Sequence, residues 1–295
     1  MINKTILDEI GNTPIVISQT LNKKPGVKLF FKLEGNNPGG SVKDRPAYNM
    51  IKSALDRGEI TSNTPLIEAT SGNTGIALAM IASLFKLSIE LVMPENSTEE
   101  RVLTMRAYGA KVTLTPADRG IEGSRDYAEA KVKNEGYKMV NQFGNDDNWK
   151  AHYKTTGPEI WKDTEGQITH FVSSMGTTGT IMGTSAYLKE KKETITIVGV
   201  QPTDNSSIPG IRKWPEAYLP GIFKPERVDR IIEVSQDEAA DMAVRLAKEE
   251  GVFAGMSSGG AVAAALKLIE DLEEGIIVVI ICDRGDRYLS SDLFR

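Results

Sequence analysis

The sequence has very few residues of the kinds that form disulfides or bind structural zinc. Among its 295 residues there are one cysteine, Cys282, and two histidines, His152 and His170. An intramolecular disulfide is therefore excluded, and we expect a reducing compartment. A zinc site built from His and Cys needs about four ligands, so no metal is predicted, although composition alone leaves a carboxylate metal site open.

The sequence also lacks a long hydrophobic run and an excess of positive charge. No apolar stretch reaches the roughly 18 residues that suggest a membrane span, and the N-terminal segment, with Asp8 and Glu9, does not look like a signal peptide. There are 35 Lys and Arg residues against 40 Asp and Glu, a net charge of −5. Proteins that bind nucleic acids usually show a basic excess. We therefore expect a cytoplasmic protein that binds neither nucleic acid nor membrane.

Short β-branched runs alternate with helical patterns along the chain. The run IIVVII at 276–281 is apolar on both faces, which is typical of a central parallel strand covered by helices. The alternation predicts an α/β fold with open parallel sheets. The predicted strands are 27–33, 66–69, 89–93, 111–115, 169–173, 194–200 and 276–282, and the predicted helices are 45–57, 74–85, 98–108, 124–134, 148–162, 180–190, 236–250 and 259–272.

Two loops interrupt this alternation. The polar stretch 143–148 separates two sets of strand–helix units, and the proline-rich stretch 201–225 is a long loop of the kind that is often functional. In parallel sheets, ligands bind beyond the carboxyl ends of the strands. We therefore expect the functional residues in the loops that follow strands.

Lys43 follows such a strand, after the turn-forming segment GNNPGGSV, at the predicted start of a helix. Cations are disfavoured at a helix N-terminus, which lowers the pKa of an amine. A neutral amine is the form that attacks a carbonyl to give a Schiff base. The alternative is a solvated surface lysine, because most lysines are exposed.

Three further loops precede helices and offer hydroxyls, amides or glycines: 70–75 (TSGNTG), 176–180 (GTTGT) and 255–260 (GMSSGG). Backbone N–H groups at a helix N-terminus suit a carboxylate or a phosphate. The loop 176–180 lacks the Gly-Lys-Ser/Thr ending of a nucleotide-binding loop. Taken alone, 70–75 is explained equally well by ordinary helix capping, and capping also explains one of the two serines of 255–260. For 176–180 the alternative is a glycine-rich turn, but a phosphate cradle is favoured because hydroxyls and glycines alternate there with no bulky residue between them.

Taken together, these loops supply a candidate Schiff-base lysine, a phosphate cradle and a carboxylate pocket. That combination fits pyridoxal phosphate acting on an amino acid.

At the same motifs the sequence resembles the fold-type II pyridoxal-phosphate enzymes, in the cysteine synthase branch. The segments that carry the resemblance span essentially the whole chain in order: GNTP, KLEGNNPGGSVKDR, EATSGNTGIALA, SSMGTTGT and GMSSGGA. The stretches AHYKTTGPEIW, SSIPGIRKWPEAYLPGIF and IICDRGDRYLS are similar to the B-type members of that branch.

The resemblance implies two open, twisted α/β/α domains with the cofactor in the cleft between them. Residues 36–148 would form a smaller, mobile domain, and residues 1–35 and 149–295 a larger one. The resemblance also implies a homodimer.

The resemblance further implies roles for individual residues. Lys43 would form the Schiff base and act as acid and base on the α-proton, Asn73 would contact the cofactor's 3′ oxygen, and Ser257 would face its pyridine nitrogen. The phosphate would be bound by Gly176, Thr177, Thr178, Gly179 and Thr180. The substrate carboxylate would be held by Thr70, Ser71, Thr74 and Gln142. Arg212, Trp214 and Cys282 would lie near the mouth or wall of the site.

The implied reaction is β-replacement: O-acetyl-L-serine loses acetate to give bound α-aminoacrylate, and sulfide adds to the β-carbon to give L-cysteine. In B-type enzymes thiosulfate can replace sulfide and give S-sulfocysteine, and Arg212 would assist that anion unless it is a solvated loop residue. Lys213 and Pro46 stand where the resemblance leads us to expect Arg and Ala.

Other interpretations stay open at this point. A related β-replacement enzyme would take O-phosphoserine or serine as donor, or homocysteine as thiol, as cystathionine β-synthase does. A non-catalytic binding protein on this scaffold is disfavoured by the presence of Lys43. An unrelated nucleotide-binding α/β protein is disfavoured by the lack of a Walker A loop and of G-x-G-x-x-G after a strand. Cys282 can equally be inert packing.

Overall fold

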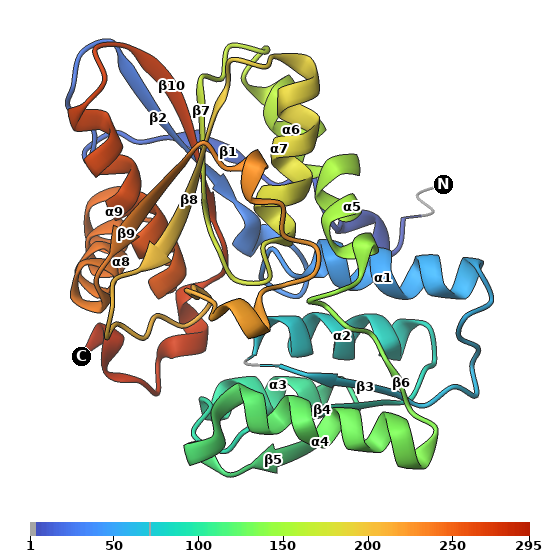
Figure 1. Ribbon diagram of the computed structural model, residues 1–295. Helices are drawn as coiled ribbons and strands as arrows, with labels where there is room; N and C mark the ends of the chain where they lie inside the picture. Colours follow the sequence, from blue (N-terminus) through green and yellow to red (C-terminus); the bar gives the residue numbers. More distant parts are fainter. Residues whose placement is uncertain (1–3, 71) are drawn as a thin grey trace.

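The computed structural model describes residues 4–70 and 72–295, which form two sheets with helices on both faces of each (Figure 1). The larger sheet has the strand order β1-β2-β10-β7-β8-β9, and only β1 runs antiparallel to its neighbour. The smaller sheet has the order β5-β4-β3-β6 and is parallel throughout. The α/β fold class that the sequence predicts is confirmed.

The strands are β1 (Ile15–Ile17), β2 (Val27–Leu33), β3 (Leu66–Ala69), β4 (Ile89–Pro94), β5 (Lys111–Thr115), β6 (Lys138–Met139), β7 (His170–Ser174), β8 (Thr196–Pro202), β9 (Arg230–Val234) and β10 (Gly275–Ile281). The helices are α1 (Asp44–Asp56), α2 (Asn73–Leu84), α3 (Glu99–Ala107), α4 (Gly120–Glu135), α5 (Asp146–Lys154), α6 (Thr156–Asp163), α7 (Gly179–Lys191), α8 (Gln236–Glu250) and α9 (Met256–Glu270).

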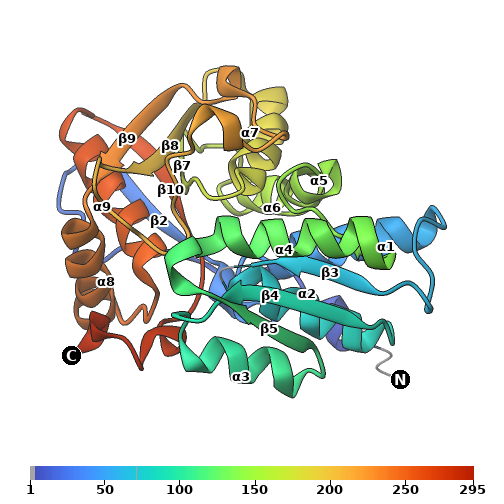
Figure 2. The same cartoon turned by 60° about the horizontal axis from the view of Figure 1, so that its bottom comes forward.

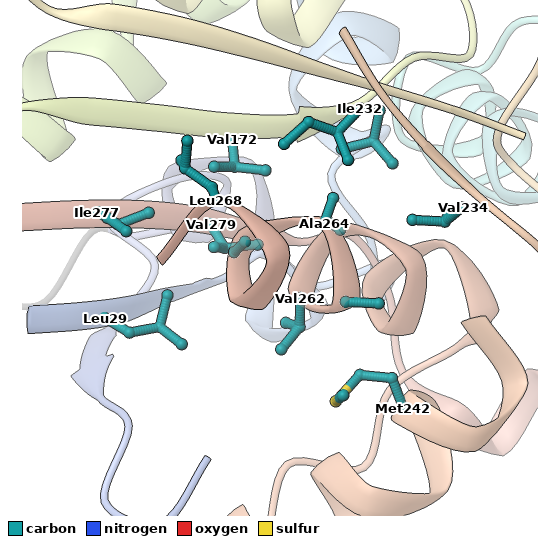
Figure 3. Close-up of a cluster of buried hydrophobic side chains, with 14 of the residues drawn as sticks. Leu29, Val172, Ile232, Val234, Met242, Val262, Ala264, Leu268, Ile277 and Val279 are labelled. Carbon is teal, nitrogen blue, oxygen red and sulfur yellow. The ribbon is translucent and has the colours of Figure 1, made fainter. Parts of the chain in front are cut away.

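Apolar side chains on both faces of the larger sheet explain why helices cover both faces. One face packs on α8 and α9, and Figure 3 shows that Leu29, Ile277 and Val279 from its strands meet Val262 and Leu268 of α9. The other face packs on α6 and α7. Helix α9 is buried along nearly its whole length, as expected for a helix that is apolar all round.

The smaller sheet is covered by α2 on one face and by α4 on the other (Figure 2). Helix α2 is also apolar all round and buried, because α1 and α3 pack against it as well. All strands of this sheet lie between residues 66 and 139, so one continuous stretch of chain builds it.

Most predicted elements are present within a few residues of their expected bounds, but the single helix predicted over 148–162 is wrong. The structure has two helices there, α5 and α6, with a break at Thr155. Pro158 explains the break, because it has no N–H to donate to the carbonyl of Lys154 and its ring clashes with that carbonyl. The short strands β1, β6 and β9 were not predicted.

A buried ionic cluster fixes the start of α1. The guanidinium of Arg45 forms two 2.7 Å hydrogen bonds to the carboxylate of Glu34, and it also contacts both carboxylate oxygens of Glu159 at 2.6 and 2.7 Å. Lys32 lies 2.9 Å from Glu159 in the same cluster. Burial acts to raise the pKa of Glu34, but the charge and hydrogen bonds of Arg45 outweigh it and keep that pKa below its usual value.

Removing the cation of this cluster should be strongly destabilising. We expect Arg45→Leu to lower the free energy of unfolding by about 3–5 kcal/mol, because it leaves a buried carboxylate without its partner. Urea unfolding measures the change. The matched control is Arg245→Leu, which removes an exposed pair with Glu249 on α8 and should cost less than about 1 kcal/mol. Equal losses for the two variants would contradict this role for the cluster.

Candidate active site

A cavity of about 620 Å³ lies where the carboxyl ends of strands from both sheets meet. The larger sheet contributes residues at or after the ends of β7, β8 and β10, and the smaller sheet contributes residues after β3 and β4. This is the position where parallel α/β sheets bind ligands. Of the predicted site residues, those that line the cavity are Lys43, Asn73, Thr74, Thr180, Arg212, Ser257 and Cys282.

Lys43 ends the loop between β2 and α1, and the backbone just before it is held against the segment that follows β10. Val42 donates its N–H to the carbonyl of Cys282 at 2.8 Å, and Ser41 forms an isolated bridge with Asp283. Within the described residues, the Lys43 amine forms no hydrogen bond or ion pair. Burial lowers the pKa of this amine, and the nearby Cys282, Asp283 and Glu34 only partly oppose the effect. The structure therefore places an amine with an enlarged neutral fraction inside the cavity.

Cys282 and Ser257 lie on the wall of the same cavity. Burial raises the pKa of the Cys282 thiol to about 11, despite the opposing effect of Lys43, so this thiol stays protonated near neutral pH and is a poor nucleophile. Ser257 is the second residue of α9, and its backbone carbonyl accepts a 2.7 Å hydrogen bond from the hydroxyl of Ser174. This bond holds the Ser257 backbone at the cavity wall.

The loop 176–180 connects β7 to the N-terminus of α7. Thr178 has a φ of 69° and precedes the first turn of the helix. Its hydroxyl oxygen is buried and has no hydrogen-bond partner in the part of the chain that the structure describes. A Cβ on Gly176 would lie 2.8 Å from the carbonyl oxygen of Gly210, and a Cβ on Gly179 would collide with the side chain of Asn148. The backbone of this loop therefore packs too closely for larger residues.

His152 lies behind this loop, on α5. Its Nε2 is 3.4 Å from the hydroxyl of Thr180, and its Nδ1 is 2.8 Å from that of Thr156. Burial, together with the charges of Arg45 and Lys43, keeps the pKa of His152 well below its usual value. The sequence pattern did not indicate that a neutral imidazole contacts the loop 176–180, because His152 on α5 and Thr180 on α7 belong to separate segments of the chain.

These residues fit pyridoxal phosphate. The N-terminus of the 13-residue helix α7 presents backbone N–H groups that suit a phosphate, and the hydroxyl of Thr178, which is buried and without a partner among the described residues, would add a donor. The neutral amine of Lys43 suits an aldehyde, and the hydroxyl of Ser257 suits a ring nitrogen. Among the described residues, no cluster of three or more His, Cys, Asp or Glu side chains could hold a metal ion.

Asn73 is the first residue of α2, and its amide is already hydrogen-bonded on both sides. The amide nitrogen donates to Asp283 at 2.7 Å, and the amide oxygen accepts from Arg287 at 2.5 Å. Asp283 follows β10, and Arg287 lies in the 3-10 helix η6 (Gly285–Tyr288). Sequence reasoning missed both partners, although their segment DRGDR (283–287) directly follows the most apolar predicted strand, where a site loop is expected.

Three of the four residues predicted to hold a substrate carboxylate lie together. The hydroxyl of Thr70 accepts from the N–H groups of Gly72 and Gly75, and the hydroxyl of Thr74 donates to Gln142 at 2.8 Å. Ser71, the fourth, lies outside the described residues. Thr74 lines the cavity, whereas Thr70 and Gln142 stand behind it.

The loop after β8 places Arg212 at the mouth of the cavity. The Arg212 N–H donates to the carbonyl of Met175 at 2.8 Å, and its guanidinium lies 5.7 Å from the ring centre of Trp214. Trp214 donates in turn to the carbonyl of Gly176 at 2.7 Å. Lys213 also lines the cavity, but its ammonium is already paired with Asp204 at 2.9 Å and Glu233 at 2.8 Å.

Comparisons with known proteins identify the family. A family model described as pyridoxal-phosphate dependent enzyme matches residues 6–283, and the chain belongs to this family. Cysteine synthase B of Pseudomonas aeruginosa is 58% identical over 291 residues, which cover 98% of this chain and 97% of that protein. Cysteine synthase B of Escherichia coli is 54% identical over 291 residues, which cover 98% of this chain and 96% of that protein.

Solved structures give the same result. The crystal structure of cysteine synthase from Entamoeba histolytica has a TM-score of 0.93 at 38% identity and covers 100% of this chain and 91% of that chain. O-acetylserine dependent cystathionine beta-synthase from Helicobacter pylori has a TM-score of 0.91 at 37% identity, with 100% of both chains covered. The expected fold family and cofactor are confirmed.

Substitution of Thr178 tests whether the loop 176–180 binds the phosphate of the cofactor. We expect Thr178→Val to weaken pyridoxal phosphate binding about tenfold or more, because a hydrogen bond to a charged group contributes about 1.5–3 kcal/mol. Stability without the cofactor should change little, since no protein group loses a partner. Titration of the cofactor-free protein measures the affinity.

Thr184→Val is the matched control, because Thr184 is also buried with an unpaired hydroxyl but lies further along α7. Equal weakening by both substitutions would show that Thr178 does not contact the phosphate.

Proposed function

We propose that this chain makes L-cysteine from O-acetyl-L-serine and sulfide by pyridoxal-phosphate-dependent β-replacement. The observation that carries the proposal is the amine of Lys43, which has a lowered pKa and lies in the cavity that also meets the N-termini of α2 and α9. The chain shares 58% identity with a cysteine synthase B over nearly its full length. Support therefore comes from both the chemistry of the site and the relatives.

Bound pyridoxal phosphate supplies an electron sink that allows a proton to leave the α-carbon of an amino acid and a group to leave its β-carbon. Lys43 is the residue that would take up the α-proton and later return it, since the only other lysine that lines the cavity in the described part of the chain, Lys213, is paired with two carboxylates. Its lowered pKa suits a base that works near neutral pH.

The substrate carboxylate is assigned to the loop before α2. Thr70, Thr74 and Gln142 surround this helix start, where backbone N–H groups favour an anion, and Ser71 is assigned to the same role from the resemblance alone. Glu68 holds the segment that carries Gln142 in place, because its carboxylate accepts hydrogen bonds from the N–H groups of Asn141 and Gln142. Burial raises the pKa of Glu68 to about 7, with these N–H donors opposing the rise.

Ser257 is assigned to the pyridine nitrogen of the cofactor. A hydroxyl there does not force that nitrogen to be protonated, as a carboxylate would. With that nitrogen unprotonated, the bound ring would be a weaker electron sink, which would favour loss of a β-substituent over build-up of negative charge. This property fits β-replacement.

We also propose that residues 36–148 move as a lid over the substrate, with 1–35 and 149–295 as the larger domain. The smaller sheet is built wholly within this stretch, and the cavity lies between the two sheets. Closure of such a cleft excludes water from the reacting groups.

Thiosulfate is proposed as a second sulfur donor, which would give S-sulfocysteine. Arg212 lines the cavity, and its guanidinium has no carboxylate partner among the described residues, whereas Lys213 is already paired with two carboxylates. A guanidinium also offers a bidentate donor pair that suits such an anion.

A cytoplasmic homodimer is proposed as the working form. The exposed apolar residues Val16 and Ile17 lie on the edge strand β1, where unpaired strand edges favour association. No helix in the described part of the chain is long and apolar enough to cross a membrane. Sedimentation equilibrium would contradict the dimer by returning the monomer mass.

Lys43→Ala should abolish cysteine formation while the protein stays folded. We expect the rate with O-acetylserine and sulfide to fall by more than about a hundredfold, since a positioned acid–base group contributes roughly 10²–10⁴-fold. Colorimetric cysteine detection measures it. Lys52→Ala, on the exposed face of α1 and paired only with Asp56, is the control.

Retained turnover in Lys43→Ala would refute the assignment of Lys43. If the unmodified protein makes cysteine from O-phosphoserine and not from O-acetylserine, the choice of donor is wrong and the reaction class stands.

Arg212→Gln should separate the two sulfur donors. We expect the KM for thiosulfate to rise about tenfold, because the variant loses a charge-assisted hydrogen bond, while the KM for sulfide changes less than about twofold. Lys213→Gln is the control and should leave both values nearly unchanged. Equal effects of Arg212→Gln on the two donors would contradict a role in anion recognition.

A further inference from the structure

The amide of Asn73 has one possible orientation in this structure. An ionised carboxylate only accepts hydrogen bonds and a guanidinium only donates them. The amide nitrogen therefore faces Asp283 and donates to its Oδ2 at 2.7 Å, and the amide oxygen faces Arg287 and accepts from its Nη1 at 2.5 Å. The amide nitrogen has a second N–H that neither partner uses. Because Asn73 lines the cavity, this N–H is the donor that the site offers to a ligand.

Arg287 links Asn73 to the loop that carries Lys43. Its Nη1 donates to Asn73, and its Nη2 donates to the carbonyl of Gly39. A Cβ on Gly40 would lie 2.5 Å from Nη2, so this loop has no room for a side chain beside the guanidinium. Arg287 is 8% exposed. One buried guanidinium thus sets the distance between the start of α2 and the loop before α1.

The η6 segment that carries Arg287 is itself fixed. The hydroxyl of Tyr288 donates to the same Asp283 oxygen that accepts from Asn73, at 2.7 Å. On the other side, the hydroxyl of Thr98 donates to the carbonyl of Arg287 at 3.2 Å, just before α3. Residues 283–288 therefore contact the loops after β3 and β4 of the smaller sheet as well as the Lys43 loop.

We propose that Arg287 is a positioning residue for the cofactor, which acts through Asn73. By holding the amide oxygen, Arg287 keeps the free N–H of Asn73 directed into the cavity, where it donates to the 3′ oxygen of pyridoxal phosphate. The inference rests on the proposed function, because it requires pyridoxal phosphate to bind in this cavity. Nothing in the inference requires Arg287 to touch the cofactor.

A double-mutant cycle on cofactor binding tests the inference. The dissociation constant of pyridoxal phosphate is measured for the cofactor-free forms of the unmodified protein, Arg287→Lys, Asn73→Ala and the double variant. We expect Arg287→Lys to weaken binding about tenfold, and to change it less than about twofold once Asn73 is alanine, since the effect passes through that side chain. The absorption maximum of the bound cofactor should shift in the same direction in Arg287→Lys and Asn73→Ala.

Arg284→Lys is the matched control. Arg284 lies three residues before Arg287, and its guanidinium is exposed and paired with Asp286, so affinity and absorption maximum should stay unchanged. If Arg287→Lys fails to fold, Arg287→Gln is used in its place, because the glutamine amide keeps an N–H donor on a shorter side chain.

Two results would overturn the inference. Equal weakening by Arg287→Lys with and without the Asn73 side chain would show a general structural role, and tighter binding would show that Arg287 competes with the cofactor for Asn73. Failure of the unmodified protein to bind pyridoxal phosphate is a separate result, which would refute the proposed function and this inference with it.

Discussion

The position of the candidate site depends on one buried guanidinium, that of Arg45. It pairs with Glu34 at the end of β2 and with Glu159 on α6, and it is the second residue of α1. The charged groups it joins are costly to bury alone, so each stays in place only while the others do. Because Lys43 is two residues earlier, this cluster fixes the point at which the chain leaves the larger sheet and presents the lysine.

The same arrangement explains the chemistry of Lys43. Glu34 is only one of three groups that favour the charged amine, and it is already engaged by Arg45. Burial therefore dominates and lowers the pKa of Lys43. A lysine with a lowered pKa has a larger neutral fraction at a given pH than a solvated one, and the neutral form is the nucleophile and the base. The fold thus supplies a reactive amine without placing a dedicated base beside it.

Much of this could be predicted from the sequence, because the signals are local. The apolar run 276–281 became the central strand β10, and the loops around Lys43, Asn73 and Thr178 follow strands and meet helix starts as expected, whereas the loop before Ser257 follows helix α8. Parallel topology then brings such loops to one edge. The helix predicted over 148–162 failed because the pattern of apolar residues continues across Pro158, whereas the backbone hydrogen bonds cannot.

Contacts between distant segments could not be predicted. The pairing of Asn73 with Asp283 and Arg287 joins residues more than 200 positions apart, and no spacing rule indicates it. The contact of His152 with Thr180 likewise depends on how α5 packs on α7. These side chains surround the predicted site residues and set their orientation. The sequence therefore indicates the reacting groups better than it indicates the residues that hold them in place.

The central claim is that Lys43 is the amine that engages the cofactor, and its most direct test is the site of covalent attachment. The protein is incubated with pyridoxal phosphate, reduced with borohydride, digested and analysed by peptide mass spectrometry. The account predicts a pyridoxyl group on Lys43 at close to one per chain. A pyridoxyl group mainly on another lysine, or none above the level of the exposed lysines, would contradict it.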